Sequence, residues 1–294
     1  MTTDISPPAM PLSSPATPPG TPATPLLDAV RTGLRVIDLG RRLTVGMPQS
    51  PNHPAYWHSL PRRHGDVVRA DGGSAANDMI TMGTHVGTHI DALAHVSHDG
   101  RLYGGVPVEA ALTGGRYADL GVHTIAPMVR RGVLLDVPAT LGVDRLDAGY
   151  EITVADLTAT VERQGVDVGP EDVVLLRSGW GQHFDSGDRQ AFMGQEHGVP
   201  GVGEAGAYWL ADHRVHAAGA DTIAFERLAP GAGHALLPAH RVLLVEQGIY
   251  LIETMDLEQL AREAVHEFLF VCAPLALFGA TGSPVRPLAV VTGG

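Results

Sequence analysis

The chain has 294 residues, of which 44% are hydrophobic and 18% charged, enough for one large or two small folded domains. All 20 basic residues are Arg, and the absence of Lys excludes Schiff-base enzymes, pyridoxal phosphate enzymes and Walker A nucleotide-binding proteins. The single Cys excludes an internal disulfide, a CxxC redox pair, an iron–sulfur cluster and a Cys-rich zinc finger. A bound metal would therefore be held by carboxylates and by His, which occurs 15 times.

The net charge and the absence of certain motifs argue against further classes of function and of binding partner. The net charge of −12 argues against nucleic-acid binding. No stretch reaches the roughly 18 apolar residues that a membrane span needs. The sequence has no GxSxG motif and no GxGxxG that opens a helix, which disfavours serine hydrolases and nicotinamide enzymes. We therefore expect a small-molecule partner, with no nucleic acid and no membrane.

The N-terminal end differs in composition from the rest of the chain. Pro, Thr, Ser and Ala dominate it, with eight prolines from Pro7 to Pro25, so it can bury little apolar surface. We expect residues 1–33 to be a disordered Pro/Thr-rich extension and residues 34–294 to be the folded domain. The extension lacks the basic start and apolar segment of a signal peptide, which together with the single Cys predicts a cytoplasmic protein.

The folded part shows strand patterns with fewer helical patterns between them. Short apolar runs predict strands at residues 35–39, 66–69, 132–137, 172–176, 217–221, 249–252, 267–277 and 287–291. A capping box at Thr153–Asp156 predicts a helix to about residue 163, and further helices are expected at 204–213, 238–246 and 257–264. The mixture indicates a single α/β or α+β domain and is too irregular for a Rossmann sheet or a TIM barrel.

One segment carries most of the chemical information. Within eleven residues it contains His85, His89, Asp91 and His95. The intervening Gly87 and Thr88 disfavour a helix, so we expect a loop or irregular turn. His85, His89 and Asp91 then converge on one cation as a two-imidazole, one-carboxylate site with open positions for water and substrate. The alternative is a set of ordinary polar loop residues.

The segment resembles the HxGTHxDxxxH motif of the cyclase superfamily, which includes bacterial kynurenine formamidases and isatin hydrolase. The resemblance extends over roughly residues 35–290. It is carried by further blocks at residues 37–39, 45–48, 219–222, 240–244, 248–253 and 282–287. It implies an α/β domain with a twisted β-barrel-like core and flanking helices.

The resemblance also implies roles for the residues of the motif. His85, His89 and Asp91 correspond to the family's ligands of a divalent metal, for which Zn²⁺ and Mn²⁺ are the candidates. His95 corresponds to its catalytic histidine. Thr88 is expected to fix the loop through hydrogen bonds between its side chain and the backbone.

Two later residues correspond to a second metal site in formamidase-like members. These are His240 and Glu253, although Glu253 has the alternative roles of orienting a ligand or lining the pocket. Leu93 stands where the formamidase motif usually has Pro, which points to another branch of the family, nearer isatin hydrolase.

These correspondences imply a metal-dependent hydrolase that cleaves a C–N bond of a small amide, formamide or cyclic amide or imide. A divalent metal activates water, and His95 moves a proton from the water to the leaving nitrogen. One alternative is a natural-product cyclase or dehydratase that uses the same metal as a Lewis acid. Another is a metal-binding protein without activity. Because family members are often oligomeric, a homodimer or higher homo-oligomer is expected.

Aromatic residues near predicted loops are candidates for substrate binding. Tyr56 and Trp57 follow a Pro-rich loop and are expected either to form a wall for a planar substrate or to anchor the loop. Trp180 follows a predicted strand and either lines the pocket or forms a structural turn. Phe225 lies where the family places pocket residues.

Overall fold

The computed structural model describes residues 25–293. Contacts divide the chain into a small terminal unit and a large unit, Val36–Val291, that contains nearly the whole fold. Residues 1–24 of the predicted extension lie outside the described residues. Its remaining part forms helix α1 (Pro25–Thr32), with Asp28 in the first turn and Arg31 in the last. Within residues 25–293, no helix is long and apolar enough to cross a membrane.

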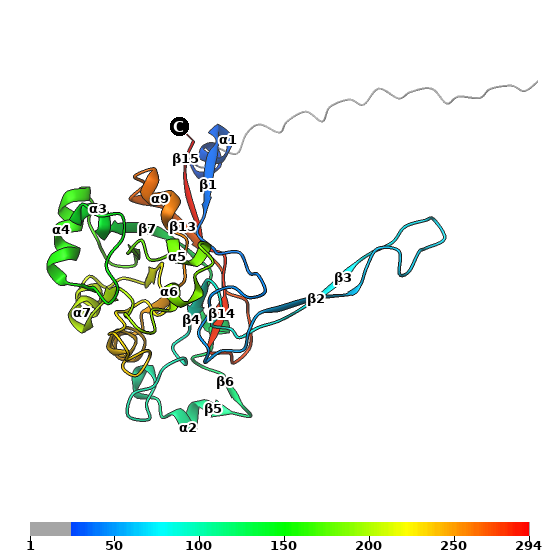
Figure 1. Ribbon diagram of the computed structural model, residues 1–294, viewed down its shortest axis with the longest axis horizontal. Coiled ribbons are helices and arrows are strands. Elements are labelled where there is room, and N and C mark those ends of the chain that lie inside the picture. The colour runs from blue at the N-terminus through cyan, green and yellow to red at the C-terminus, as the bar shows by residue number, and fades with distance from the viewer. Residues whose placement is uncertain (1–24, 294) are drawn as a thin grey trace, which may run out of the picture. The chain divides into compact units, whose positions relative to one another are not determined.

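Strands and short helices follow one another along the chain (Figure 1). The strands are β1 (Leu34–Asp38), β2 (Trp57–Arg62), β3 (Asn77–Thr81), β4 (His89–Asp91), β5 (Leu112–Thr113), β6 (Arg116–Tyr117), β7 (Met128–Asp136), β8 (Glu151–Ile152), β9 (Val173–Arg177), β10 (Gly201–Val202), β11 (Ala217–Ala220), β12 (Tyr250–Glu253), β13 (Glu267–Cys272), β14 (Gly282–Pro284) and β15 (Leu288–Thr292). The α-helices are α2 (Val108–Ala111), α3 (Val137–Leu141), α4 (Val154–Gln164), α5 (Gln182–Asp185), α6 (Arg189–Met193), α7 (Glu204–Asp212), α8 (Pro238–His240) and α9 (Glu258–Arg262). The 3₁₀-helices are η1 (Tyr103–Gly105) and η2 (Val122–Thr124), and η3 (Arg241–Gln247) is a π-helix.

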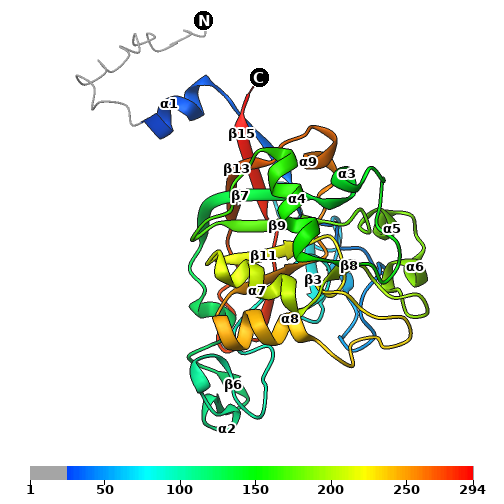
Figure 2. The same ribbon diagram turned by 90° about the vertical axis from the view of Figure 1, so that its left-hand side faces the viewer.

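Nine strands form one sheet in the order β1-β15-β13-β7-β9-β11-β12-β4-β14. The central strands β7, β9, β11 and β12 are parallel, and the strands on both sides of them pair antiparallel. Parallel neighbours need long connections, which here carry helices. Figure 2 shows α4, α7 and α8 in front of β7, β9 and β11.

Both faces of the sheet are buried, in two separate clusters. On β9, Val174 and Leu176 belong to the cluster that contains residues of α4, α7 and η3, whereas Val173 and Leu175 belong to the other cluster. That second cluster also contains Ile37 of β1, Ala289 of β15 and Ile90 of β4, from opposite ends of the strand order. The sheet therefore curls around its inner cluster. This confirms the predicted α/β domain with a barrel-like core and flanking helices.

The local signals agree with the structure at α4 and fail at residues 66–69. The Thr153 hydroxyl accepts from the Asp156 N–H and the Asp156 carboxylate accepts from the Thr153 N–H, which completes the capping box that starts α4. Residues 66–69 form no strand of the sheet. They lie in the loop between β2 and β3, where only an isolated bridge joins Val68 and Ser74.

The hairpin of β2 and β3 extends away from the sheet (Figure 1), and we call residues 57–81 the arm. Every residue of both strands is exposed. The exposed apolar residues of the arm are Trp57, Leu60, Val67, Val68, Met79 and Ile80. A lone two-stranded hairpin is at best marginally stable in water, so the arm offers a large apolar surface for a contact.

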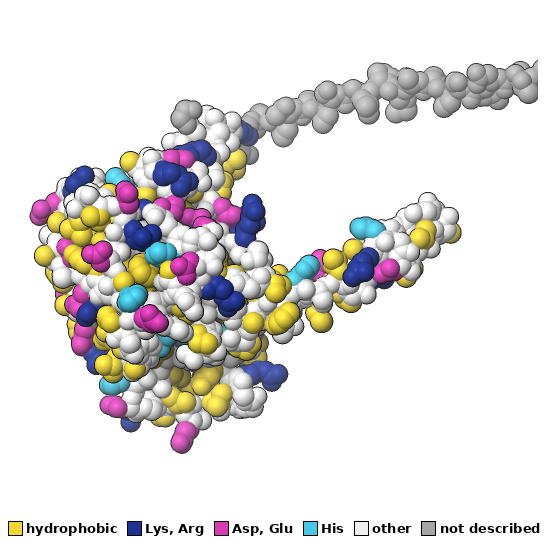
Figure 3. All heavy atoms as spheres, viewed as in Figure 1, with side chains coloured by type: hydrophobic (Ala, Val, Ile, Leu, Met, Phe, Trp, Pro, Cys, Tyr) yellow, Lys and Arg dark blue, Asp and Glu magenta, His cyan; other side chains and the backbone are white. Residues whose placement is uncertain are grey.

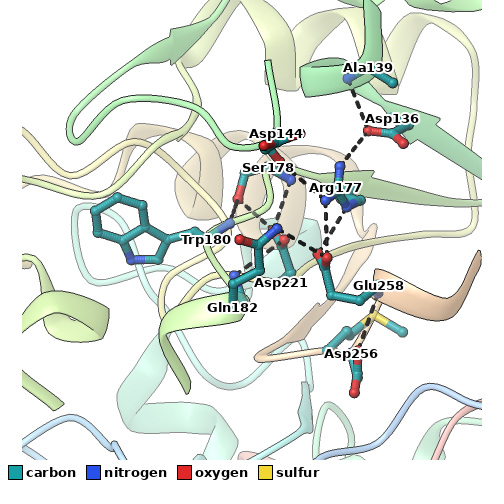
Figure 4. A network of polar contacts seen from close by, with 12 residues as sticks. Asp136, Ala139, Asp144, Arg177, Ser178, Trp180, Gln182, Asp221, Asp256 and Glu258 are labelled. Carbon is teal, nitrogen blue, oxygen red and sulfur yellow. Dashed lines mark hydrogen bonds and ion pairs between the residues drawn. The ribbon is translucent and has the colours of Figure 1, made fainter. Parts of the chain in front are cut away.

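A buried ion-pair network closes the end of β9 (Figure 4). Arg177, the last residue of β9, donates to Asp136 Oδ1 over 2.9 Å and to both carboxylate oxygens of Glu258 over 2.9 and 3.1 Å. These partners hold the pKa of Arg177 above its ordinary value although burial acts to lower it. Beside this network, Asp221 accepts from the backbone N–H and hydroxyl of Ser178. Both contacts fix the turn that follows β9.

We predict that Arg177→Met lowers the free energy of unfolding by about 3–5 kcal/mol, because it leaves the buried Asp136 carboxylate without its cation. Urea denaturation measures the change. The matched control is Arg130→Met on β7, whose partner Glu171 is 68% exposed, and about 0–1 kcal/mol is expected there. Equal losses in the two variants would contradict a special role for the network.

Candidate active site

Strand β4 carries the centre of the predicted site. Because alternate residues of a strand point to the same side, His89 and Asp91 share one face while Ile90 enters the inner hydrophobic cluster. Both polar side chains are buried, and Asp91 is 0% exposed. A buried carboxylate needs positively charged or hydrogen-bonding partners, and the neighbouring strands supply them.

Strand β12 brings a second carboxylate to the same place. It pairs antiparallel with β4 so that Glu253 lies directly opposite His89. Directly opposed side chains are close neighbours, and Glu253 Oε2 is 3.4 Å from His89 Nε2. Strand pairing, rather than proximity in the sequence, therefore places Glu253 beside the motif.

His85 lies at the edge of β4 that pairs with β14, opposite the edge that pairs with β12. Its Nδ1 is 2.6 Å from Asp91 Oδ1, and its Nε2 is 2.9 Å from the Thr281 hydroxyl. Gly282 of β14 pairs with Asp91, and a Cβ at Gly282 would collide with the His85 ring. Gly87 forms the turn between the histidines with φ of 69°, and a Cβ there would lie 2.5 Å from Leu43. Glycines at these two positions make room for the ring and the turn.

His240, the last residue of α8, completes the cluster. Its Nε2 lies 3.6 Å from Asp91 Oδ2 and 3.2 Å from Glu253 Oε1. The ring of His95 stacks on His85 with centroids 3.8 Å apart. The structure thus places together the six residues of the predicted metal and catalytic set. Two groups of side-chain donors, each within 4.8 Å, share Asp91: His85 with His95, and His89 with Glu253.

The cluster favours a positive charge at its centre. Burial acts to lower the pKa of His89, but Glu253 and Asp91 outweigh it and raise that pKa to about 9. The pKa of His240 is likewise held above its ordinary value against burial by the carboxylates around it. Burial acts to raise the pKa of Asp91, and the surrounding histidines hold it well below its ordinary value. The protein therefore stabilises ionised carboxylates at a buried point.

The donor atoms fit a divalent metal. Asp91 Oδ2 and Glu253 Oε1 are buried and, among the residues that the structure describes, have no hydrogen-bond partner. His240 Nε2 is close to Glu253 Oε1, but the contact does not have hydrogen-bond geometry. Free carboxylate oxygens facing imidazole nitrogens are ligands that a transition metal accepts. Buried carboxylates without such a partner are costly.

His95 differs electrostatically from the other histidines of the site. Burial lowers its pKa to about 4, although Asp91 acts in the opposite direction. The ring is therefore neutral at physiological pH and has a free nitrogen lone pair. A neutral imidazole beside a candidate metal-binding group is suited to accept a proton.

A cavity of about 220 Å³ opens onto His85, His89, His95, His240 and Glu253. The residues that complete its lining are Ser50, Asn52, His53, Val96, Ile223, Ala224, His234 and Leu237. None of these eight was singled out as a ligand or substrate contact. They come from loops whose spacing shows no pattern, and the high His count was the only signal for His53 and His234.

The four aromatic residues predicted to bind substrate do not line this cavity. Trp57 begins the arm and is 62% exposed, and Tyr56 is half-buried against a separate hydrophobic cluster. Trp180 is buried and donates its indole N–H to the Phe192 carbonyl (Figure 4 shows its ring). Phe225 is fully buried in the core beneath the helices. Trp180 lines a separate pocket together with Asp144 and His183, and Phe225 is enclosed by the core.

Thr88 ties the motif to the end of β12, as expected from its position. Its hydroxyl accepts from the Arg41 N–H over 2.8 Å and donates to the Thr254 carbonyl over 2.7 Å. Thr254 directly follows Glu253 and has a left-handed φ of 57°. The two hydrogen bonds therefore fix the turn that ends β12 against the motif loop.

Comparisons with curated proteins give several distant relatives. Cyclase-like protein 3 of Oryza sativa subsp. japonica is 29% identical over 172 residues, and the match covers 53% of this chain and 60% of that protein. Isatin hydrolase of Roseibium aggregatum is 25% identical over 76% of this chain and 77% of its own. Kynurenine formamidase of Geobacillus thermodenitrificans is 26% identical over 85% of this chain and 94% of its own.

Solved structures show the same fold. A crystal structure described as a novel cyclase matches with a TM-score of 0.77 and 30% identity over 90% of this chain and 93% of its own. Isatin hydrolase A from Ralstonia solanacearum matches with a TM-score of 0.70 and 26% identity over 95% and 100%. The family model "Cyclase", described as "Putative cyclase", matches residues 21–227. The chain that builds this cluster of histidines and carboxylates belongs to the cyclase family.

Proposed function

We propose that the protein is a metal-dependent hydrolase that cleaves a C–N bond of a small amide, formamide or cyclic amide or imide. The observation that carries the proposal is the buried pair of Asp91 and Glu253, whose free oxygens both face His240 Nε2. The relatives named isatin hydrolase and kynurenine formamidase support the reaction class. The proposed metal is Zn²⁺ or Mn²⁺, since two imidazoles and a carboxylate suit either.

A divalent metal would supply Lewis-acid polarisation of the scissile carbonyl and activation of water. His85, His89 and Asp91 are the proposed ligands. His240 and Glu253 would hold a second metal together with Asp91, or Glu253 would orient a ligand or line the pocket. In either arrangement His240 and Glu253 fill the space beside Asp91.

His95 is the proposed proton carrier. Its neutral ring lines the cavity and stacks on the ring of His85. His95 therefore lies beside the proposed metal ligands and is not proposed as one of them. A ring nitrogen of His95 accepts a proton from the attacking water and returns it to the leaving nitrogen. The loss of a basic leaving group from an amide requires such a proton.

The cavity also limits the substrate. Its volume of about 220 Å³ accommodates a small molecule and excludes a folded polypeptide. Val96, Ile223 and Leu237 contribute apolar surface to its lining, and Asn52 and His53 contribute polar groups. This mixture suits a compact substrate with one polar, cleavable group.

We predict that His95→Ala lowers kcat by about 10²–10⁴-fold while the metal content of the protein is unchanged, because His95 moves the proton and holds no metal. The assay uses N-formylkynurenine, isatin and a panel of cyclic imides, with metal content measured by elemental analysis. The matched control is His98→Ala, since His98 is an exposed neighbour outside the cavity and its loss should leave both quantities unchanged.

Three results would count against the proposal. Loss of metal from the His95→Ala protein would make His95 a ligand. Full activity in that variant would remove it from the chemistry. Failure of the metal-loaded wild-type protein to hydrolyse any compound of the panel would favour a cyclase or dehydratase that uses the same metal, or a metal-binding protein without activity.

We also propose that the protein forms a homodimer or higher homo-oligomer through the arm. Figure 3 shows yellow apolar side chains along the arm, where no other part of the described chain covers them. Met79 and Ile80 are each 58% exposed, and as neighbours on β3 they point to opposite faces. The arm of a second copy of this chain would bury these apolar side chains, which the arm of a single copy leaves exposed.

We predict that the double substitution Met79→Glu with Ile80→Glu converts the assembly to monomers of 30.9 kDa, because a charge on each face opposes burial of the arm. Size-exclusion chromatography with light scattering measures the mass. Val143→Glu, at an exposed apolar residue outside the arm, should leave the assembly intact. A monomeric wild-type protein, or an unchanged mass in the double variant, would contradict the proposal.

A further inference from the structure

Glu226 is a buried carboxylate that lies behind the proposed metal site. It is 0% exposed, and its carboxylate accepts hydrogen bonds from Ala239 and His240, the last two residues of α8. Its Oε2 accepts from the Ala239 N–H over 3.0 Å, and its Oε1 accepts from the His240 N–H over 3.0 Å and lies 2.7 Å from His240 Nδ1. Three donors thus converge on this one carboxylate.

These contacts decide which nitrogen of His240 carries the proton. A carboxylate that already accepts from two backbone N–H groups is an acceptor toward the ring as well, so Nδ1 must donate to it. In the neutral ring, Nε2 then has no hydrogen. This nitrogen is the one that faces Asp91 Oδ2 and Glu253 Oε1, the two buried oxygens without a hydrogen-bond partner.

The opposite tautomer would weaken the site for a metal. With the proton on Nε2, a hydrogen of His240 would point toward Asp91 and Glu253 and occupy the place of a cation. A cation would then gain less from the carboxylate and would have to displace the proton. The tautomer imposed by Glu226 leaves the nitrogen lone pair and both oxygens available for a cation.

The backbone holds Glu226 in this position from two sides. The preceding residue, Phe225, has φ of 54°, which is strained for a bulky side chain, and its ring is fully buried. On the other side, β10 lies against the segment: Val202 forms a bridge with Glu226, and a Cβ at Gly201 would collide with the Glu226 backbone. Such strain persists only where the surrounding structure fixes the residue.

We propose that Glu226 is a positioning residue that sets the metal affinity of the site by holding His240 with its proton on Nδ1. The inference rests on the proposed function, because it requires that the cluster binds a metal. Glu226 itself touches neither metal nor substrate in this arrangement. Its role resembles that of carboxylates that orient the histidine ligands of metals in general.

The test is Glu226→Gln in chelator-treated, reloaded protein. The glutamine side chain has the same shape, but it carries no charge and its amide group must point a donor at one of the three N–H groups, so it holds the proton on His240 Nδ1 less firmly. We expect the dissociation constant for Zn²⁺ to rise about 10–100-fold, measured by competition with a chelating indicator. The visible absorption of the Co²⁺-loaded protein should also change, because the ligand field loses or distorts one imidazole.

The matched control is Asp136→Asn. Asp136 is also a buried carboxylate that accepts from backbone and side-chain donors, but its partners are Ala139 and Arg177, away from the site. Its loss should leave the Zn²⁺ dissociation constant and the Co²⁺ spectrum unchanged. A similar loss of affinity in this variant would mean that any buried charge change disturbs the site, and it would overturn the inference.

The background variant His240→Ala separates positioning from general damage. If Glu226 acts through His240, adding Glu226→Gln to His240→Ala gives no further loss of Zn²⁺ affinity, whereas an additive loss would contradict the inference. Should Glu226→Gln not fold, Glu226→Asp, which retains the charge but withdraws it from Nδ1, must show the same loss. Unchanged affinity in a folded variant overturns the inference alone. A wild-type protein without measurable Zn²⁺ or Mn²⁺ affinity overturns the proposed function.

Discussion

Two carboxylates, Asp91 and Glu253, are buried close to one another where β4 pairs with β12. The residues around them supply the contacts that stabilise these two charges. Transfer of one charge out of water is costly, and the cost of two like charges is greater. The pairing of β4 with β12 makes the arrangement possible, because it places Glu253 opposite His89, on the face of β4 that points away from the inner cluster. The centre of the site is therefore built on the sheet itself rather than on a loop alone.

The histidines around the carboxylates are oriented by contacts that point away from the centre. His89 Nδ1 lies 2.8 Å from the Gly87 carbonyl, which only accepts, so this nitrogen carries a proton. His240 Nδ1 is held in the same way by Glu226. Both rings consequently turn a bare Nε2 toward Asp91 and Glu253 when they are neutral. Imidazole lone pairs that face carboxylate oxygens are electrostatically satisfied by a cation.

The outer contacts make the centre rigid. The Thr88 hydroxyl joins the motif loop to the turn after Glu253 and also accepts a hydrogen bond from the backbone N–H of Arg41. The Arg41 side chain in turn donates to the Met255 carbonyl, two residues after Glu253. Glycine at Gly87 and Gly282 lets the loop and the ring of His85 approach β4. Rigid ligands lose less freedom when a metal binds, which favours a defined geometry.

The sequence predicts the parts of this account that are local. The spacing of His85, His89 and Asp91 indicated a metal site, and the capping box located the start of α4. The roles of His240 and Glu253 came from resemblance, because only strand pairing and the end of α8 bring them to β4. The sequence around Trp180 and Phe225 does not indicate where their rings point, since an aromatic ring packs as readily in a core as in a pocket. The role of Glu226 depends on a contact with α8 that no spacing in the sequence reveals.

The central claim is that the buried carboxylate pair holds a divalent metal. Anomalous diffraction from crystals of the protein purified without added chelator, recorded at the absorption edges of zinc and manganese, tests it most directly. The account predicts an anomalous peak between the carboxylate oxygens of Asp91 and Glu253 and the imidazole nitrogens that face them. Hydrolysis of a substrate by protein that shows no peak there, or a peak bound elsewhere on the chain, would contradict it.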